Sequence, residues 1–403
     1  MQSKTQQIED LLNKGVEKII DEKHFKDALI SGKKLRIKHG IDPTGDKIHL
    51  GRASQLWKLK DFQDLGHRIV LVIGDFTAQI GDPSDKPDGR KGLTEKEIKK
   101  NMASYIKQFD KILDIKKTEI RYNSEWFKKI GLDEFLSIAK IFSVQQMVHR
   151  RNFNERWKKE QSITLQEIYY PLLQGYDSVA LKADAELGGY DQLFNLKTGR
   201  DIQKHYGQKP QDIMALRMLS GLDGRKMSTS WGNVVNISDE PKDMFGKIMS
   251  MKDEMMEEYF EICARLSEKE LQEVKKKLKD KKYNPKDLKE ELALKIVSLY
   301  WGEKKAEKAK QEFEKVFKDK GLPSDIRVFF APKKEYPILE LLFHLDLAKS
   351  KGEAKRLIQQ GGARIDSKKI TDFNKIIKVE EGLVIQAGKR NFARLTLKDG
   401  REE

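Results

Sequence analysis

The chain has 403 residues, 38% hydrophobic and 35% charged, so it can bury a large core and form about two or three domains. The N-terminus is polar, unlike a secretory signal, and no apolar run is long enough to cross a membrane. Cys263 is the only cysteine, which excludes an internal disulfide and a cysteine-based zinc site. We therefore expect a soluble protein of the reducing cytoplasm. The net charge of +15 fits either a solvated lysine-rich surface or a polyanionic partner.

The first half of the chain has the pattern of an α/β protein. Residues 1–30 have the spacing of one or two amphipathic helices. Residues 35–41 and 68–76 are predicted to be strands buried on both faces, with a helix over 51–65 between them. Such a βαβ unit predicts a parallel sheet with helices on both sides. A further strand is predicted over 118–126.

The second half is predicted to be mainly helical. The segment 211–233 is expected to start as a helix and to break into a loop rich in Gly and Ser. Residues 240–318 are lysine-rich and helical, and 320–337 have the Pro and Gly content of a linker. A compact module of two short helices followed by strands is predicted from 338 to about 400.

Two short stretches carry candidate chemistry. In "KHGIDPTGDKIHLGRASQLWKLKDF", His49 and Gly51 stand where a helix is predicted to start, with Asp42 and Thr44 upstream. A helix start and a neutral imidazole can both bind phosphate, although an ordinary strand-to-helix turn has the same pattern. The second stretch, "GRKMSTS", combines cations with hydroxyl groups and could close over a triphosphate, or it could be a basic surface loop.

These stretches resemble the "HIGH" and "KMSKS" signatures of class I aminoacyl-tRNA synthetases. The segments "GIDPTGDKIHLG", "GDFTAQIGDPSDK", "YYPLLQGYD" and "LGGYDQLFN" follow the order found in bacterial tyrosyl-tRNA synthetases. The resemblance covers nearly the whole chain. It implies a Rossmann-like parallel-sheet catalytic domain over 1–225 with a dimer-forming insertion at about 125–165. A helical domain over 226–320 and a small α+β domain of the S-four RNA-binding type over 336–403 are implied to follow.

The activity implied by this resemblance is that of a tyrosine–tRNA ligase. Such an enzyme joins L-tyrosine to ATP, releases diphosphate, and transfers tyrosine from the adenylate to the 3′ end of tRNA(Tyr). The family works as a homodimer. Mg²⁺ is expected to arrive with ATP, although no dedicated carboxylate cage is recognisable in the sequence.

The spacing of three polar residues indicates a candidate amino-acid site. Tyr170, Gln174 and Asp177 are four and three residues apart, so in a helix they share one face, which could line a pocket or merely pack. Pro171 must then lie in the first turn or at a kink. By resemblance, Asp177 accepts the phenolic O–H, and Lys38 stands beside the phenol pocket, where many members have a tyrosine. The tyrosine-binding set implied by the family is Lys38, Asp82, Tyr170, Gln174, Asp177 and Gln192.

The resemblance also implies ATP-binding and catalytic residues. The ATP-binding set is Asp42, His49, Gly51, Asp191, Lys226, Met227 and Ser228. The catalytic set is Thr44, His49, Arg52, Lys86, Arg90 and Lys226. Lys86 and Arg90 match residues that engage departing diphosphate, although they could be solvated loop charges. Besides Lys38, two positions depart from the family pattern: Arg52 replaces the second histidine of the first signature, and Thr229 replaces the second lysine of the second.

The candidate RNA-binding residues lie near the C-terminus. Lys351 and Lys355 are four residues apart, with Arg356 beside them, so they form a cationic helix face that suits an RNA backbone or is merely solvated.

Two rival functions remain at this point. One is a tryptophanyl-tRNA synthetase, and the other is a catalytically silent relative that only binds RNA, to which the changes at Arg52 and Thr229 would point.

Overall fold

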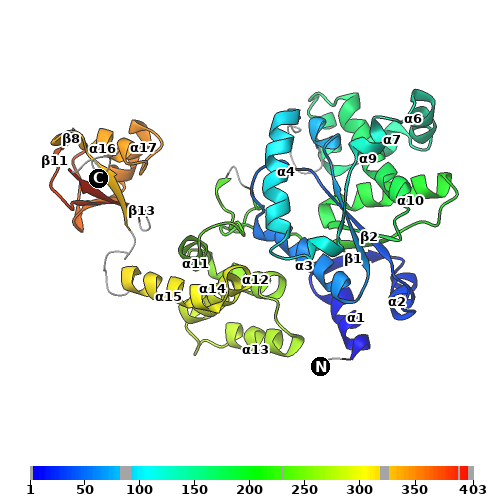
Figure 1. Ribbon diagram of the computed structural model, residues 1–403, viewed down its shortest axis with the longest axis horizontal. Coiled ribbons are helices and arrows are strands. Elements are labelled where there is room, and N and C mark those ends of the chain that lie inside the picture. The colour runs from blue at the N-terminus through cyan, green and yellow to red at the C-terminus, as the bar shows by residue number, and fades with distance from the viewer. Residues whose placement is uncertain (1–2, 82–91, 229–230, 318–325, 389–390, 398–403) are drawn as a thin grey trace. The chain divides into compact units, whose positions relative to one another are not determined.

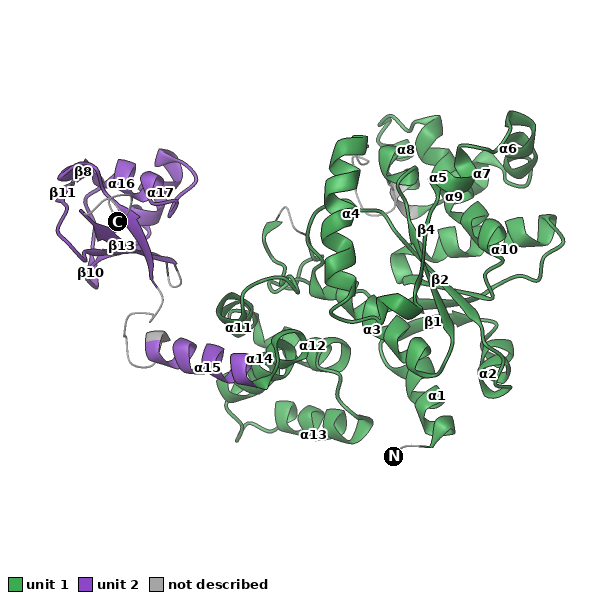
Figure 2. Cartoon of the chain, viewed as in Figure 1, with its two compact units in different colours: residues 1–303 green, residues 304–403 purple. Residues whose placement is uncertain are grey.

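The computed structural model describes residues 3–81, 92–228, 231–317, 326–388 and 391–397. The chain divides into two compact units, residues 1–303 and 304–403, shown in different colours in Figure 2. Among the described residues, no helix combines the length and the apolar character needed to span a bilayer.

Unit 1 is built around a six-stranded sheet with the order β1-β6-β5-β2-β3-β4 (Figure 1). Strands β2 to β6 run parallel to their neighbours, and β1 pairs antiparallel with β6 at one edge. The strands are β1 Val16–Ile20, β2 Arg36–Ile41, β3 Arg68–Ile73, β4 Glu119–Tyr122, β5 Ala185–Gly189 and β6 Asp212–Leu216.

Helices cover the sheet and continue into a helical region. Those of the first part are α1 Lys4–Asn13, α2 Glu22–Ile30, α3 Leu50–Asp64, α4 Glu95–Phe109, α5 Ser124–Phe127, α6 Leu132–Ala139, α7 Val144–Val148, α8 Arg151–Lys158, α9 Leu165–Leu181 and α10 Leu193–His205. The helical region contains α11 Pro241–Met249, α12 Met256–Cys263, α13 Glu268–Lys279 and α14 Pro285–Trp301.

The strand order creates a switch point between β2 and β5. From β2 the chain crosses through α3 to β3 on one side, whereas from β5 it crosses through α10 to β6 on the other. Because parallel crossovers are right-handed, α3 and α10 cover opposite faces. Ligands in such sheets bind beyond the carboxyl ends of the strands at the switch point. In this chain the segments that follow β2, β3 and β5 meet there.

Unit 2 has a hydrophobic core of its own, in which Ile338, Leu341, Ile358 and Ile385 are buried. It contains a five-stranded sheet of order β10-β9-β12-β13-β7 and a two-stranded sheet of β11 and β8. Its elements are α15 Glu303–Phe317, which starts at the unit boundary, β7 Arg327–Phe330, β8 Glu335–Pro337, α16 Ile338–His344, α17 Lys351–Gln359, β9 Ala363–Ile365, β10 Lys368–Lys369, β11 Ile376–Lys378, β12 Val384–Ala387 and β13 Asn391–Thr396.

The structure confirms several predicted elements and corrects others. The βαβ unit, the helical stretch from 240 and the helices and strands after 338 are confirmed. The helix predicted to start segment 211–233 is wrong, because Asp212–Leu216 is a buried strand paired with β1 and β5.

Three further boundaries differ from the prediction. Within residues 1–30, where one or two helices were expected, a strand, β1, separates two helices. The strand predicted over 118–126 ends at Tyr122, where α5 soon follows. Part of the predicted linker, Arg327–Phe330, is instead a strand that pairs in parallel with β13.

Candidate active site

The two signature motifs meet beyond the carboxyl edge of the sheet. The backbone N–H of Leu50 donates to the carbonyl of Val235 at 2.9 Å, and that of Ile237 donates to Ile48 at 2.9 Å. These bonds tie the start of α3 to the segment that follows the lysine-serine loop. A Cβ atom on Gly51 would lie 3.2 Å from His49 Nδ1 and 3.3 Å from Met227 Sδ. Glycine therefore allows the close approach of the imidazole and the thioether.

His49 is the N-cap of α3 and is held in its neutral form. Burial and the nearby charge of Arg52 lower the pKa of the imidazole to about 3. Its buried Nδ1 atom has no hydrogen-bond partner among the residues that the structure describes. A buried polar atom of this kind usually has a partner, so the ring is suited to bond a ligand.

Arg52 is fixed by three neighbours. Its guanidinium donates to Thr44 Oγ1 at 2.8 Å, to the Asp42 carbonyl at 3.5 Å, and to the hydroxyl of Tyr105. Tyr105 is a buried residue of α4 that the sequence did not identify. The replacement of histidine by arginine thus brings a permanent charge that is oriented close to His49.

Asp42 joins the two halves of the site. Its Oδ2 accepts from the hydroxyl of Tyr170 at 2.8 Å, and its Oδ1 accepts from Thr77 Oγ1 at 2.8 Å. A Cβ atom on Gly74 would lie 1.9 Å from Asp42 Oδ1, so only glycine fits at this position. Asp42 therefore contacts α9 through its side chain and Arg52 through its carbonyl.

Helix α9 carries the residues predicted for the amino-acid pocket. It starts with a capping box of Thr164 and Glu167, and it contains Pro171 beyond the first turn. Asp177 is buried, and its Oδ1 accepts from Trp126 Nε1 at 2.9 Å. Burial raises the pKa of the Asp177 carboxyl to about 7, although Lys38 and the Trp126 bond act in the opposite direction. The Asp177 carboxyl therefore changes between its protonated and charged forms near neutral pH.

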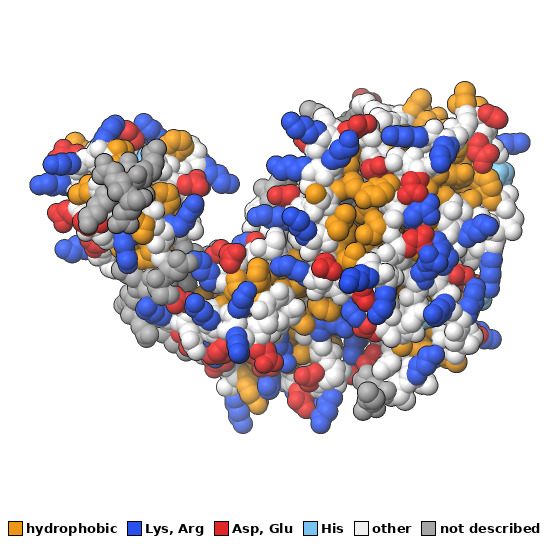
Figure 3. Space-filling view, in the orientation of Figure 1, with side chains coloured by type: hydrophobic (Ala, Val, Ile, Leu, Met, Phe, Trp, Pro, Cys, Tyr) orange, Lys and Arg blue, Asp and Glu red, His pale blue; other side chains and the backbone are white. Residues whose placement is uncertain are grey.

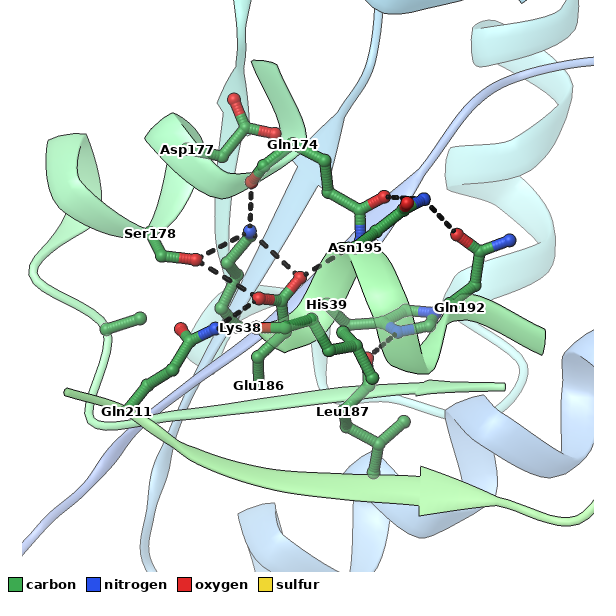
Figure 4. A network of polar contacts seen from close by, with 12 residues as sticks. Lys38, His39, Gln174, Asp177, Ser178, Glu186, Leu187, Gln192, Asn195 and Gln211 are labelled. Atoms are coloured by element: carbon green, nitrogen blue, oxygen red, sulfur yellow. Dashed lines mark hydrogen bonds and ion pairs between the residues drawn. The ribbon is translucent and has the colours of Figure 1, made fainter. Parts of the chain in front are cut away.

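A polar network lies between α9 and the strands of the sheet (Figure 4). The Gln174 side chain donates from Nε2 to Glu186 Oε1 at 3.3 Å and accepts at Oε1 from Asn195 Nδ2 at 3.0 Å. Asn195 also donates to Gln192 Oε1 at 2.8 Å, so it links two residues of the predicted tyrosine-binding set. Lys38 is buried within the network and bonds Gln174, Ser178 and Glu186. Asp191 precedes Gln192 and is exposed.

Asn233 organises the described part of the lysine-serine loop. Its Oδ1 accepts from the N–H of Ser228 at 2.8 Å. Its Nδ2 donates to Asp223 Oδ1 at 2.9 Å and to the carbonyl of Lys226 at 3.1 Å. Lys226 is exposed, whereas Arg225 pairs with Asp223 and lies 4.8 Å from the ring of Trp231. The carboxyl of Asp223 has a pKa well below its usual range, because Asn233 and Arg225 both donate to it.

Some predicted residues lie elsewhere. Asp82, Lys86, Arg90 and Thr229 are outside the described residues. In unit 2, the side chains of Lys351, Lys355 and Arg356 are exposed on α17, whose Ala354 and Ile358 are buried in the core of the unit. The Lys355 ammonium also lies 4.5 Å from the ring of Phe373.

Comparisons with known proteins show the family of the chain. The family described as "tRNA synthetases class I (W and Y)" matches residues 31–318, and "Tyrosine–tRNA ligase SYY-like C-terminal domain" matches 312–395. A tyrosine–tRNA ligase of Clostridium acetobutylicum is 43% identical, over 96% of this chain and 97% of that relative. One from Thermotoga maritima is 42% identical over 96% of each.

The fold also matches solved structures. Tyrosyl-tRNA synthetase from Archaeoglobus fulgidus, complexed with L-tyrosine, has a TM-score of 0.63 at 22% identity, covering 77% of this chain and 100% of that one. The C-terminally truncated mitochondrial enzyme of Aspergillus nidulans has a TM-score of 0.62 at 19% identity, covering 79% and 95%. With two family matches and relatives above 40% identity along nearly its whole length, the chain belongs to the tyrosine–tRNA ligases of the class I aminoacyl-tRNA synthetases.

Proposed function

We propose that this chain is an active tyrosine–tRNA ligase whose substrates are L-tyrosine, ATP and tRNA(Tyr). The tyrosine carboxylate attacks the α-phosphorus of ATP, and the bond to the β-phosphate breaks, releasing diphosphate and leaving tyrosyl-adenylate. A ribose hydroxyl at the 3′ end of the tRNA then attacks the tyrosyl carbonyl and AMP leaves. Neither step needs a nucleophilic side chain, so the protein contributes orientation and charge stabilisation.

The observation that carries the proposal is the position of Asp42. Its carboxylate bonds Tyr170 on α9, and its carbonyl accepts from Arg52 of the first signature. Residues assigned to tyrosine and residues assigned to ATP are thereby joined through one residue at the switch point, by its side chain on one side and its backbone carbonyl on the other. A carboxylate and an α-phosphate must be brought together at such a junction for adenylate formation.

On the amino-acid side, Asp177 is the proposed acceptor of the phenolic O–H. It is buried, so a phenylalanine ring would leave the carboxyl without its expected donor, which costs more than a missing contact. Tyr170, Gln174 and Asp82 are proposed to hold the α-amino group, and Gln192 the carboxyl end. The combination of Tyr170, Gln174 and Asp177 with the C-terminal domain matched to tyrosine–tRNA ligases disfavours a tryptophanyl-tRNA synthetase.

On the nucleotide side, neutral His49 is proposed to donate to an ATP phosphate, with Gly51 and Asp191 beside adenine and ribose. Lys226, Arg52 and Thr44, with Lys86 and Arg90, would stabilise charge on the departing diphosphate. Met227 and Ser228 complete the proposed ATP contacts. The silent alternative is disfavoured because Arg52 is held in a defined position by Thr44 and Tyr105.

Mg²⁺ is proposed to enter with the ATP phosphates. Within the described residues, the group of carboxylates and imidazoles close enough to share an ion is Asp21, His24 and Asp212. Asp212 begins β6, opposite the first residue of β5, so this group lies at the amino edge of the sheet. This group therefore lies at the edge of the sheet opposite the residues proposed to bind ATP.

The RNA-binding part is proposed to be the segment 336–403. Lys351, Lys355 and Arg356 present cations on α17 toward solvent, as contact with an RNA backbone requires. The catalytic domain is proposed over 1–225 and the helical anticodon-side domain over 226–320. Burial of Cys263, the only thiol in the chain, is compatible with a cytoplasmic location, which we also propose.

A homodimer through the insertion at about 125–165 is proposed from exposed apolar side chains. Figure 3 shows hydrophobic side chains gathered on the part of unit 1 that carries α6. Leu132 and Leu136 of α6, with Val144 of α7 and Leu165 of α9, are among the exposed large hydrophobic residues. Exposed apolar side chains that gather in one patch usually mark an interface.

The test is ATP–diphosphate exchange with single amino acids in the absence of tRNA. Exchange that depends on tyrosine and not on tryptophan or phenylalanine is expected. Exchange driven by tryptophan, or RNA binding with no exchange at all, would contradict the proposal and identify the corresponding alternative.

A further inference from the structure

Lys38 and Glu186 form an internal ion pair at the switch point of the sheet. They are directly opposite each other on the paired strands β2 and β5. The Lys38 Nζ and Glu186 Oε1 atoms are 2.9 Å apart, and the two side chains are 0% and 1% exposed. Neither group can therefore reach bulk water in this state.

Every hydrogen-bonding direction of the ammonium is used. Besides Glu186, Lys38 Nζ donates to the carbonyl of Gln174 at 2.8 Å and to Ser178 Oγ at 2.9 Å. The ammonium has three donors, so three bonds saturate it. Lys38 thus has no donor left for a substrate hydroxyl, although the family match places it beside the phenol pocket.

The carboxylate of Glu186 is bonded as completely. Its Oε1 accepts from Lys38 and from Gln174 Nε2 at 3.3 Å. Its Oε2 accepts from Ser178 Oγ at 3.1 Å and from Gln211 Nε2. The pair therefore joins two strands to one turn of α9, from Gln174 to Ser178, and Asp177 lies within that turn (Figure 4).

A contribution to the stability of the fold does not explain why an ion pair is buried this deeply. Two buried charges lose their hydration, and replacing such a pair by apolar residues is often neutral or stabilising. This pair fixes the position of the turn, and Lys38 places a positive charge close enough to act on Asp177. Lys38 acts to lower the pKa of Asp177, against burial and the carboxylates of Glu186 and Asp42, while Trp126 donates to it from α5.

We propose that the buried Lys38–Glu186 pair is the positioning device for tyrosine recognition: it holds the Gln174–Ser178 turn on the sheet and keeps Asp177 available as a charged acceptor for the phenol. Lys38 is thus a positioning residue that sets specificity through Asp177 and Gln174 without touching the substrate. This inference rests on the proposed function, because it presupposes that tyrosine binds beside α9.

The test compares three variants in tyrosine- and phenylalanine-dependent exchange. Lys38→Met removes the cation but leaves Glu186 buried and unpaired, so it can fail to fold. Lys38→Met combined with Glu186→Gln removes both charges and is expected to fold. Ser178→Ala removes only the hydroxyl that bridges the pair, and it provides a mild change that can be assayed whatever the behaviour of the other two.

For the double variant, we expect the ratio of kcat/KM for tyrosine to that for phenylalanine to fall by at least about tenfold, the loss typical of one hydrogen bond to a charged group. The KM for ATP should stay within about twofold, because the nucleotide residues are untouched. The acidic limb of kcat/KM for tyrosine should move to higher pH, because Lys38 lowers the pKa of Asp177 by more than Glu186 raises it, so loss of both charges raises that pKa. Ser178→Ala should lower the ratio in the same direction by about threefold.

Lys58→Met is the matched control. Lys58 is a second buried lysine, on α3, and donates to the carbonyls of Leu11 and Lys14. Its loss should lower the melting temperature and leave the tyrosine-to-phenylalanine ratio unchanged. A folded double variant, or Ser178→Ala, with the wild-type ratio and pH profile would overturn the inference alone. Wild-type protein without tyrosine-dependent exchange would instead refute the proposed function, and with it the inference.

Discussion

Asn233 offers the sharpest test of how the lysine-serine loop is held. Replacing it by alanine removes three hydrogen bonds, to Ser228, Asp223 and Lys226, from a buried side chain. At about 0.5–1.5 kcal/mol for each bond, the loop would lose about 1.5–4.5 kcal/mol of local stabilisation. If the whole loss falls on the transition state for adenylate formation, the rate should drop by about 10- to 1600-fold, since about 1.4 kcal/mol is a factor of ten.

The assay is single-turnover formation of tyrosyl-adenylate, with tyrosine affinity and the melting temperature measured in parallel. Asn236→Ala is the matched control, because Asn236 is buried in the same segment but makes one long side-chain bond, 3.3 Å to Asp239. Gly221→Ala should reproduce the effect sterically, because its Cβ would lie 2.2 Å from Asn233 Nδ2. A rate for Asn233→Ala within about threefold of that of the control, with both proteins folded, would refute this role.

Three other predictions concern the lysine-serine loop, the acceptor Asp177 and the C-terminal segment. Lys226→Ala should slow adenylate formation by about 10²-fold with little change in tyrosine affinity, as single-turnover kinetics would show; a loss below about threefold would contradict a role in charge stabilisation. The kcat/KM for tyrosine should fall as the pH drops below about 7, because protonation of Asp177 removes the charged acceptor, and Asp177→Asn should abolish this limb in a pH–rate profile. Removal of residues 326–403 should spare diphosphate exchange but impair tRNA charging, a difference that aminoacylation at two salt concentrations would detect.

The sequence predicted those parts of the fold whose signal is local. Strand β3 is a nearly continuous apolar run, and a Pro/Gly turn separates the shorter strand β2 from the amphipathic helix α3, so the βαβ unit could be recognised. Strand β6 was mistaken for a helix because its apolar run is too short to distinguish the two. Its identity as a strand depends on its pairing with β5 and with β1. The pair of Val16 and Leu216 joins positions 200 residues apart.

The candidate site shows the same division. Tyr170, Gln174 and Asp177 were found from their spacing, which α9 realises as a helix. Trp126 was missed because it reaches Asp177 from 51 positions away, and nothing near it in the sequence indicates a partner. Tyr105, 53 positions from Arg52, was missed for the same reason. Single polar or aromatic residues gain a role only when the fold brings distant segments together.

The separate core of unit 2 has a consequence for how the protein fails. Because its buried residues pack among themselves, unit 2 should unfold as a cooperative unit of its own, and a calorimetric trace of the whole chain should not fit one two-state transition. A destabilising substitution at Leu342 would then melt unit 2 at a lower temperature without disturbing the sheet that carries Asp42 and Asp177. Such a protein would still bind and activate its amino acid while losing the part proposed to hold RNA, so its defect would be in delivery rather than in chemistry.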